Sequence, residues 1–258
     1  MANSGPVLRI DKLDMRFGGL VALHDVSFSA ERGAVTAIIG PNGAGKTTLF
    51  NCITSMYRPT SGTVTFLGQN ITGLPPHRIA QAGIARTFQN LALFQGLTVL
   101  ENLLVGAYRH GASGLLEGAL LGWRARREER AARTRAGDIL GFLGLSDVAG
   151  SLPGELPYGL QKQVEFGRAL MQQAQLILLD EPMAGMSRAE KTRMVALIRD
   201  VRDRLGVSFL VVEHDMPVIM DISDKIVVLD FGRKIADGTP HQVQDDKAVI
   251  AAYLGAEA

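Results

Sequence analysis

The chain has 258 residues, 47% of them hydrophobic, and its 27 basic and 26 acidic residues leave a formal net charge of +1. This length and composition predict a folded chain with a substantial core and exclude a disordered or collagen-like protein. The single cysteine, Cys52, excludes an internal disulfide. The first residues lack a signal-peptide pattern, and no apolar run approaches the roughly 18–20 residues that span a bilayer, so we expect a reducing, cytosolic environment. The near-zero net charge gives no general reason to expect nucleic-acid binding.

The first part of the chain alternates short β-type runs with segments that contain glycine and proline. Val7–Ile10, Val26–Ser29 and Thr63–Leu67 are typical of strands in an N-terminal β layer. Between the last two lies Val35–Ile39, which is followed by a glycine-rich loop and a helix-like stretch, Lys46–Ile53. This order of strand, loop and helix is typical of α/β nucleotide-binding folds.

The middle of the chain, from Leu91 to about Leu145, is rich in Leu, Ala, Arg and Glu, so we expect an inserted helical lobe. Compact β-type runs return at Leu176–Leu179, Phe209–Val212 and Ile226–Leu229. The stretch Glu190–Leu205 has the length of a crossover helix between parallel strands.

Residues 40–47 read Gly-Pro-Asn-Gly-Ala-Gly-Lys-Thr and fit the pattern G-x-x-x-x-G-K-[ST] between a predicted strand and a predicted helix. In such a loop, backbone N–H groups and the helix N-terminus bind phosphate oxygens, Lys46 reaches the β and γ oxygens, and Thr47 ligates Mg²⁺. An ordinary glycine-rich turn is the alternative, but the complete motif in this context favours phosphate binding. The residues expected to form this cradle are Gly40, Asn42, Gly43, Ala44, Gly45, Lys46, Thr47 and Thr48.

The apolar run Leu176–Leu179 places two adjacent carboxylates, Asp180 and Glu181, at its C-terminal end. We expect Asp180 to hold Mg²⁺ through water or Thr47, and Glu181 to polarise the water that attacks the γ-phosphate. A solvated turn is the usual role of an acidic pair after a strand. The P-loop upstream favours the catalytic interpretation.

The P-loop and the acidic pair, in this order, resemble the ATP-binding-cassette (ABC) family over essentially the whole chain. The resemblance implies an α/β fold, with a P-loop NTPase core and parallel sheet, an N-terminal antiparallel β layer and an inserted helical subdomain. It also implies that Gln89 is a catalytic and Mg²⁺-sensing glutamine that meets the membrane partner, that His214 contacts the γ-phosphate, and that Phe17 stacks on adenine. Each residue also has a structural alternative. Gln89 would then be a polar group at a loop end, His214 a cap at a strand end and Phe17 a core side chain.

The family signature, usually Leu-Ser-Gly-Gly-Gln, reads Leu-Pro-Tyr-Gly-Leu at residues 156–160. In the family this helix start clamps the nucleotide of the opposite subunit, and Pro157 can donate a hydrogen bond neither from its side chain nor from its backbone. We therefore expect Pro157 and Gly159 to form a weakened clamp, with a plain helix entry as the alternative. Ser187 lies where the family commonly has Asp or Asn in its D-loop, and with Glu190 it also fits a capping box.

Five further segments resemble the cytosolic ATP-binding subunits of importers for branched-chain or hydrophobic amino acids. These segments are Met15–Leu20, Ala85–Gln89, Leu100–Leu104, Glu213–Met216 and Ala252–Gly255. The resemblance implies ATP and Mg²⁺ as cofactors, integral-membrane permease subunits, a second identical or related ATP-binding subunit and an indirect link to a solute-binding protein. It also implies a peripheral location at the cytoplasmic face of the inner membrane. The net charge, and the single aromatic near the arginine-rich stretch, lead us to expect no nucleic-acid partner.

We therefore expect an ATPase subunit that powers an importer, built from three parts. Residues 1–89 form the β layer and the P-loop part of the core, residues 90–165 the helical signature subdomain, and residues 166–258 the remaining core and the tail. A soluble ABC ATPase outside transport and a weakly hydrolysing regulatory subunit remain alternatives. The arginine-rich stretch Trp123–Arg135 is typical of a solvated helix face, with Glu129 and Arg133 at the spacing of an ion pair, and a membrane-proximal patch is the alternative.

Overall fold

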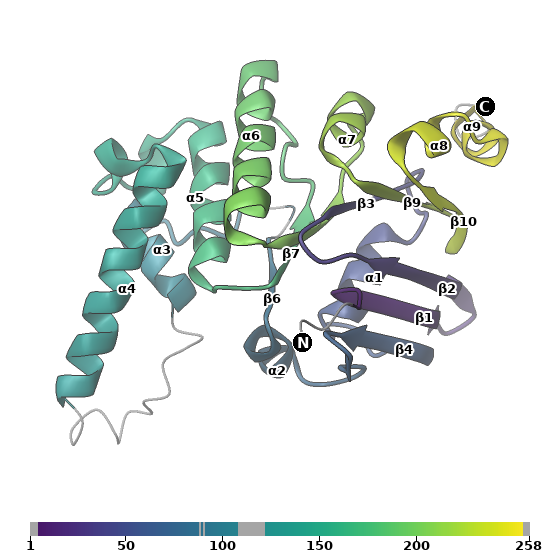
Figure 1. The fold of residues 1–258 in the computed structure, drawn as a ribbon, viewed down its shortest axis with the longest axis horizontal. Coiled ribbons are helices and arrows are strands. Elements are labelled where there is room, and N and C mark those ends of the chain that lie inside the picture. The colour runs from purple at the N-terminus through teal and green to yellow at the C-terminus, as the bar shows by residue number, and fades with distance from the viewer. Residues whose placement is uncertain (1–4, 88, 90, 108–121, 255–258) are drawn as a thin grey trace.

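The structure, a computed structural model, describes residues 5–87, 89, 91–107 and 122–254, and its strands form two sheets (Figure 1). The first sheet is antiparallel and has the order β2-β1-β4-β5. Its strands are β2 (Leu20–Ala30), β1 (Leu8–Phe17), β4 (Ser61–Phe66) and β5 (Gln69–Asn70). The expected antiparallel layer is confirmed.

Strand β1 extends past the predicted run, which ended at Ile10 because the apolar alternation stops at an irregularity in the strand. Pairing with β2 shifts in register between Ile10 and Leu13, and Lys12 has a φ of 46°. The strand resumes after this bulge and buries Leu13 and Met15. Because the bulge interrupts the alternation, the sequence pattern did not predict the second half of the strand.

The second sheet has the order β10-β9-β3-β8-β7-β6 and is parallel except for β10. Its strands are β10 (Arg233–Gly238), β9 (Lys225–Asp230), β3 (Val35–Ile39), β8 (Ser208–Val212), β7 (Leu176–Asp180) and β6 (Ile84–Arg86). Every residue of β3, β7 and β8 is buried, as continuous apolar runs in a parallel sheet require. The fold class is therefore the expected one.

Helices cover both faces of the parallel sheet and form a lobe at one side. The helices are α1 (Lys46–Ile53), α2 (Pro76–Ala82), α3 (Val99–Ala107), α4 (Gly122–Leu143), α5 (Tyr158–Met171), α6 (Arg188–Leu205), α7 (Met216–Ile222), α8 (Pro240–Gln244) and α9 (Lys247–Leu254), with short 3₁₀ turns at Ser146–Val148 and Pro153–Glu155. Figure 1 shows α3, α4 and α5 together beside α6. Helix α5 continues across residue 165, so the boundary expected there falls inside a helix.

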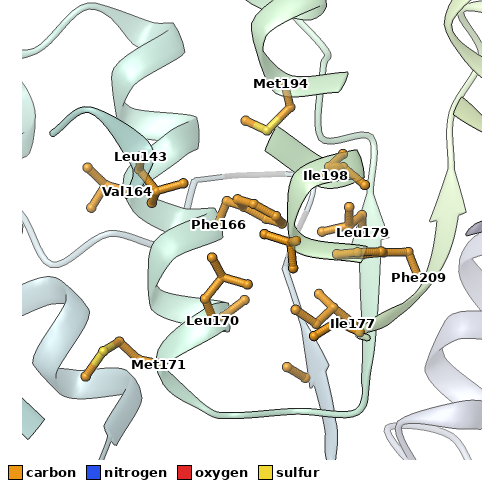
Figure 2. Close-up of a cluster of buried hydrophobic side chains, with 14 of the residues drawn as sticks. Leu143, Val164, Phe166, Leu170, Met171, Ile177, Leu179, Met194, Ile198 and Phe209 are labelled. Atoms are coloured by element: carbon orange, nitrogen blue, oxygen red, sulfur yellow. The ribbon is translucent and has the colours of Figure 1, made fainter. Parts of the chain in front are cut away.

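A buried hydrophobic cluster joins this lobe to the sheet. Figure 2 shows Phe166 of α5 facing Phe209 of β8, with Ile198 of α6 close by. The two ring centroids are 6.2 Å apart. Because these side chains are almost fully buried, they fix α5 and α6 against β7 and β8. Among the described residues, no helix combines the length and apolar character that crossing a membrane requires.

Candidate functional site

Strands β3, β7 and β8 end at one edge of the parallel sheet, and the expected site residues follow them there. Ile38 pairs with Val212, and Val212 pairs with Asp180, so the three carboxyl ends are aligned. The P-loop follows β3, Glu181 follows β7, and His214 comes two residues after β8. This edge is where open α/β sheets bind their ligands.

The loop after β3 has glycines with a positive φ at Gly40, Gly43 and Gly45, and at two of them a Cβ would also meet neighbouring backbone. Gly40 has a φ of 148°, and a Cβ there would lie 2.0 Å from the carbonyl oxygen of Leu229. Gly45 has a φ of 101°, and a Cβ there would lie 2.8 Å from the carbonyl oxygen of Ala22. The loop is therefore packed against neighbouring backbone and leads directly into the first turn of α1, as a phosphate cradle requires.

Lys46 opens α1 and folds back over the loop. Its Nζ donates hydrogen bonds to the carbonyl oxygens of Gly40 at 2.7 Å and of Pro41 at 2.9 Å. Burial lowers the pKa of Lys46, and the nearby carboxylates of Glu181 and Asp180 oppose this shift. The neighbouring residues Asn42, Gly43 and Thr47 are exposed, so a ligand can reach the loop.

Asp180 is buried, and its carboxylate forms an ion pair that the sequence did not predict. A guanidinium nitrogen of Arg86, at the end of β6, lies 2.8 Å from Asp180 Oδ2, and the two side chains are 8% and 6% exposed. The same guanidinium donates to Asn51 Oδ1 at 2.6 Å and to Thr54 Oγ1 at 3.2 Å, both in or just after α1. Arg86 therefore ties Asp180 to the P-loop helix. An arginine at the end of an otherwise apolar strand is the sequence feature that could have indicated this ion pair.

Glu181 and Gln89 lie in contact. Gln89 Nε2 donates a hydrogen bond to Glu181 Oε2 at 3.1 Å. The backbone N–H of Glu181 donates to the carbonyl oxygen of Val212 at 2.9 Å, and Glu181 has a φ of 48°, in the left-handed region. The structure therefore brings Gln89 and Glu181 together at the edge that carries the P-loop.

His214 lies at the same edge, but its side chain extends toward solvent. The imidazole is 69% exposed, and its Nδ1 lies 3.8 Å from Glu213 Oε2. Glu213 is 2% exposed and accepts hydrogen bonds from the backbone N–H groups of Met183 at 2.9 Å and His214 at 3.0 Å. Glu213 thus links the end of β8 to the loop after Glu181, and the sequence interpretation assigned it no role of its own. A carboxylate that directly follows a fully apolar strand is the sequence feature that could have indicated a role for Glu213.

Phe17 ends β1 at the periphery of the site. The side chain is 41% exposed, and its ring meets the ring of Tyr57 edge-on, with centroids 5.1 Å apart. Phe17 is therefore not a core residue, which removes its structural alternative. An exposed aromatic ring held by a second ring is suited to stacking on a flat base.

The signature residues lie on the helical lobe, away from the P-loop of their own chain. Pro157 is the N-cap residue of α5, and Figure 1 shows α5 and α1 separated by the strands of the parallel sheet. A Cβ at Gly159 would lie 2.2 Å from Glu190 Oε1, so the carboxylate of Glu190 covers this helix start. Hydrogen bonds from Ser187 and then Gly159 lower the pKa of Glu190. Ser187 and Glu190 form the expected capping box of α6.

The donor set at this edge fits a magnesium ion that is also held by phosphate. Mg²⁺ takes oxygen ligands and is usually bound through one or two protein groups together with waters and phosphates. The Asp180 carboxylate, the Thr47 hydroxyl and the Gln89 amide supply oxygens of this kind. Among the described residues, no group of three or more His, Cys, Asp or Glu is placed to hold a metal ion by itself.

Comparisons with known proteins agree with this geometry. Residues 23–184 match the family described as ABC transporter, and residues 233–258 match the family described as branched-chain amino acid ATP-binding cassette transporter. The high-affinity branched-chain amino acid transport ATP-binding protein BraF of Pseudomonas aeruginosa is 45% identical, with 98% of this chain and 99% of that protein covered. LivG of Escherichia coli K12, described in the same words, is 41% identical with the same coverage.

Solved structures give the same result. A nucleotide-free ATP-binding cassette from an ABC transporter has a TM-score of 0.84 and 36% identity, with 96% of this chain and 99% of that chain covered. The ADP conformation of MJ1267, an ATP-binding cassette of an ABC transporter, has a TM-score of 0.85 and 36% identity, with 97% and 99% covered. The chain belongs to the ABC transporter family, as an ATP-binding cassette.

Proposed function

We propose that this cassette hydrolyses ATP with Mg²⁺ and thereby powers an importer of branched-chain or other hydrophobic amino acids. The transport part is supported by full-length similarity to BraF and LivG, and by the match of residues 233–258 to the branched-chain family. The hydrolytic part rests on one observation above all, the hydrogen bond between Gln89 and Glu181 beside the P-loop.

The residues at this edge have distinct roles in phosphoryl transfer to water. The loop N–H groups and Lys46 bind the β- and γ-phosphates. Thr47, Asp180 and Gln89 would hold Mg²⁺, which would neutralise phosphate charge when bound. Glu181 orients the attacking water and accepts its proton as ADP leaves. The adenine stacks on Phe17.

The remaining proposed contacts complete the site around the γ-phosphate and across a dimer. His214 contacts the γ-phosphate once the exposed imidazole turns toward it. Pro157 and Gly159, at the start of α5, contact the nucleotide of a second ATP-binding subunit, identical or related, once the Glu190 carboxylate that accepts from the Gly159 N–H has moved aside.

The partners are proposed on the same similarity. They are integral-membrane permease subunits, with a solute-binding protein linked indirectly, and the cassette sits peripherally at the cytoplasmic face of the inner membrane. Co-purification with a permease from native membranes separates this function from a soluble ABC ATPase. Measured turnover separates it from a weakly hydrolysing regulatory subunit.

Two variants test the assigned chemistry. Lys46→Ala removes the ammonium that faces the phosphates, so ATP binding weakens, whereas Glu181→Gln keeps binding but blocks hydrolysis. Equilibrium titration with a fluorescent ATP analogue and phosphate-release assays measure the two properties separately. Equal loss of nucleotide binding in both folded variants would contradict the assignment.

A further inference from the structure

Three charged residues lie one turn apart along α5 in the helical lobe, two of them buried and the third half-buried. Lys162 and Glu165 are each 3% exposed, and the Arg168 side chain is 15% exposed. The carboxylate of Glu165 lies between the two cations, 4.0 Å from Lys162 Nζ and 4.0 Å from an Arg168 nitrogen. Burying charge costs free energy unless hydrogen-bond partners compensate it. The partners of these cations therefore indicate what the cluster holds in place.

Both cations bind the backbone of the segment that carries Gln89. Lys162 Nζ donates a hydrogen bond to the carbonyl oxygen of Gln89 at 3.3 Å, and Arg168 donates to the carbonyl oxygen of Ala92 at 2.5 Å. The Lys162 ammonium also lies 5.9 Å from the centroid of the Tyr158 ring, in the first turn of α5. The segment with Gln89 is thus attached at two points to the helix that begins with the signature.

Gln89 connects this attachment to the catalytic edge. Its carbonyl oxygen accepts from Lys162, while its side-chain amide donates to Glu181 at 3.1 Å. Hydrogen bonds weaken steeply beyond about 3.5 Å, so a backbone shift of about 1 Å at Gln89 is enough to lose the contact with Glu181. The position of Lys162 therefore bears on the orientation of a carboxylate that it does not touch.

We propose that Lys162 is a positioning residue for ATP hydrolysis, which fixes the backbone at Gln89 so that the Gln89 amide holds Glu181. The proposal rests on the ATPase activity proposed above. A purely structural role, in which Lys162 only stabilises the helical lobe, is the competing account. The two accounts differ in one respect: a residue that acts through Gln89 loses its effect on turnover once the Gln89 side chain is removed.

The test compares Lys162→Met, Lys162→Arg, Gln89→Ala and the double variant Lys162→Met/Gln89→Ala in phosphate-release assays. Lys162→Met lowers kcat about tenfold, the effect of losing one charged hydrogen bond, and leaves the KM for ATP within about twofold. Lys162→Arg keeps a cation of similar reach and retains most of the rate. The double variant is no slower than Gln89→Ala alone. Lys247→Met, at an exposed lysine of α9, is the matched control and hydrolyses ATP at the wild-type rate.

A second measurement is independent of turnover. Amide hydrogen exchange around Gln89 becomes faster in Lys162→Met than in the wild type or Lys247→Met, because the backbone loses one of its two attachments. An unchanged exchange rate, an unchanged kcat in folded Lys162→Met, or losses that multiply in the double variant would each overturn the proposal. A wild-type chain without ATPase activity would instead refute the proposed function, and exchange would still decide whether Lys162 anchors Gln89.

Discussion

Replacing Arg86 by methionine leaves the Asp180 carboxylate buried without its ion-pair partner. The two side chains are 8% and 6% exposed and meet at 2.8 Å, so water does not substitute for the lost guanidinium. Breaking a buried pair by removing one partner costs about 3–5 kcal/mol. For a chain of this size that corresponds to a fall in Tm of roughly 6–20 °C. Urea and thermal unfolding followed by circular dichroism at pH 7 measure both quantities.

Two further variants make the Arg86 prediction specific. Arg86→Met/Asp180→Leu removes the stranded charge as well and recovers most of the stability, because apolar replacement of a whole buried pair is often neutral. Arg133→Met breaks an exposed pair with Glu129, whose side chains are 58% and 63% exposed, and costs less than about 1 kcal/mol. The reasoning is refuted if Arg86→Met costs less than about 1 kcal/mol, or if the double variant is no more stable than the single one.

Three other predictions follow from the site. Gly40→Ala places a methyl group 2.0 Å from a backbone oxygen and weakens nucleotide binding at least about tenfold. Gly43→Ala has a smaller effect in the same titration, because its φ of 81° strains a side chain but a Cβ there meets nothing within 4 Å; equal effects would contradict this. Pro157→Ser adds a hydroxyl donor at the signature and speeds hydrolysis about ten- to a hundred-fold, and an unchanged single-turnover rate would show that the Gly159 N–H and the helix start suffice. Burial raises the pKa of the Cys52 thiol to about 12 from its usual 9.0, so iodoacetamide labels the native thiol slowly at pH 8, and rapid labelling of the native chain would refute this. The free energy of unfolding falls as pH rises from about 9 to 12, because over that range only the unfolded thiol ionises.

Contiguous motifs made much of the fold predictable from the sequence. The P-loop and the acidic pair each lie within a few residues, next to strands that are buried throughout and therefore apolar throughout. The α4 side chains that the structure describes include Glu129 and Arg133, exposed and paired at the expected spacing.

Elements with weak or interrupted patterns were missed. Strand β6 has three residues, and β10 alternates only partly and lies half-exposed at the sheet edge. The pairing of Arg86 with Asp180 joins residues 94 positions apart, and that of Lys162 with Gln89 joins residues 73 apart. No local pattern encodes such contacts, because they arise only when the strands and helices have packed.

Because the backbone of Glu181 is left-handed, the residue that would be most stable at this position is not the one that the proposed activity needs. A non-glycine residue held at a φ of 48° costs of order 1 kcal/mol or more, and glycine adopts that conformation without strain. Selection of variants for thermal stability alone therefore favours Glu181→Gly, which removes the carboxylate that we propose to orient water. Directed evolution of this cassette for robustness will have to select for turnover at the same time, or it will enrich stable proteins that bind ATP and do not release phosphate.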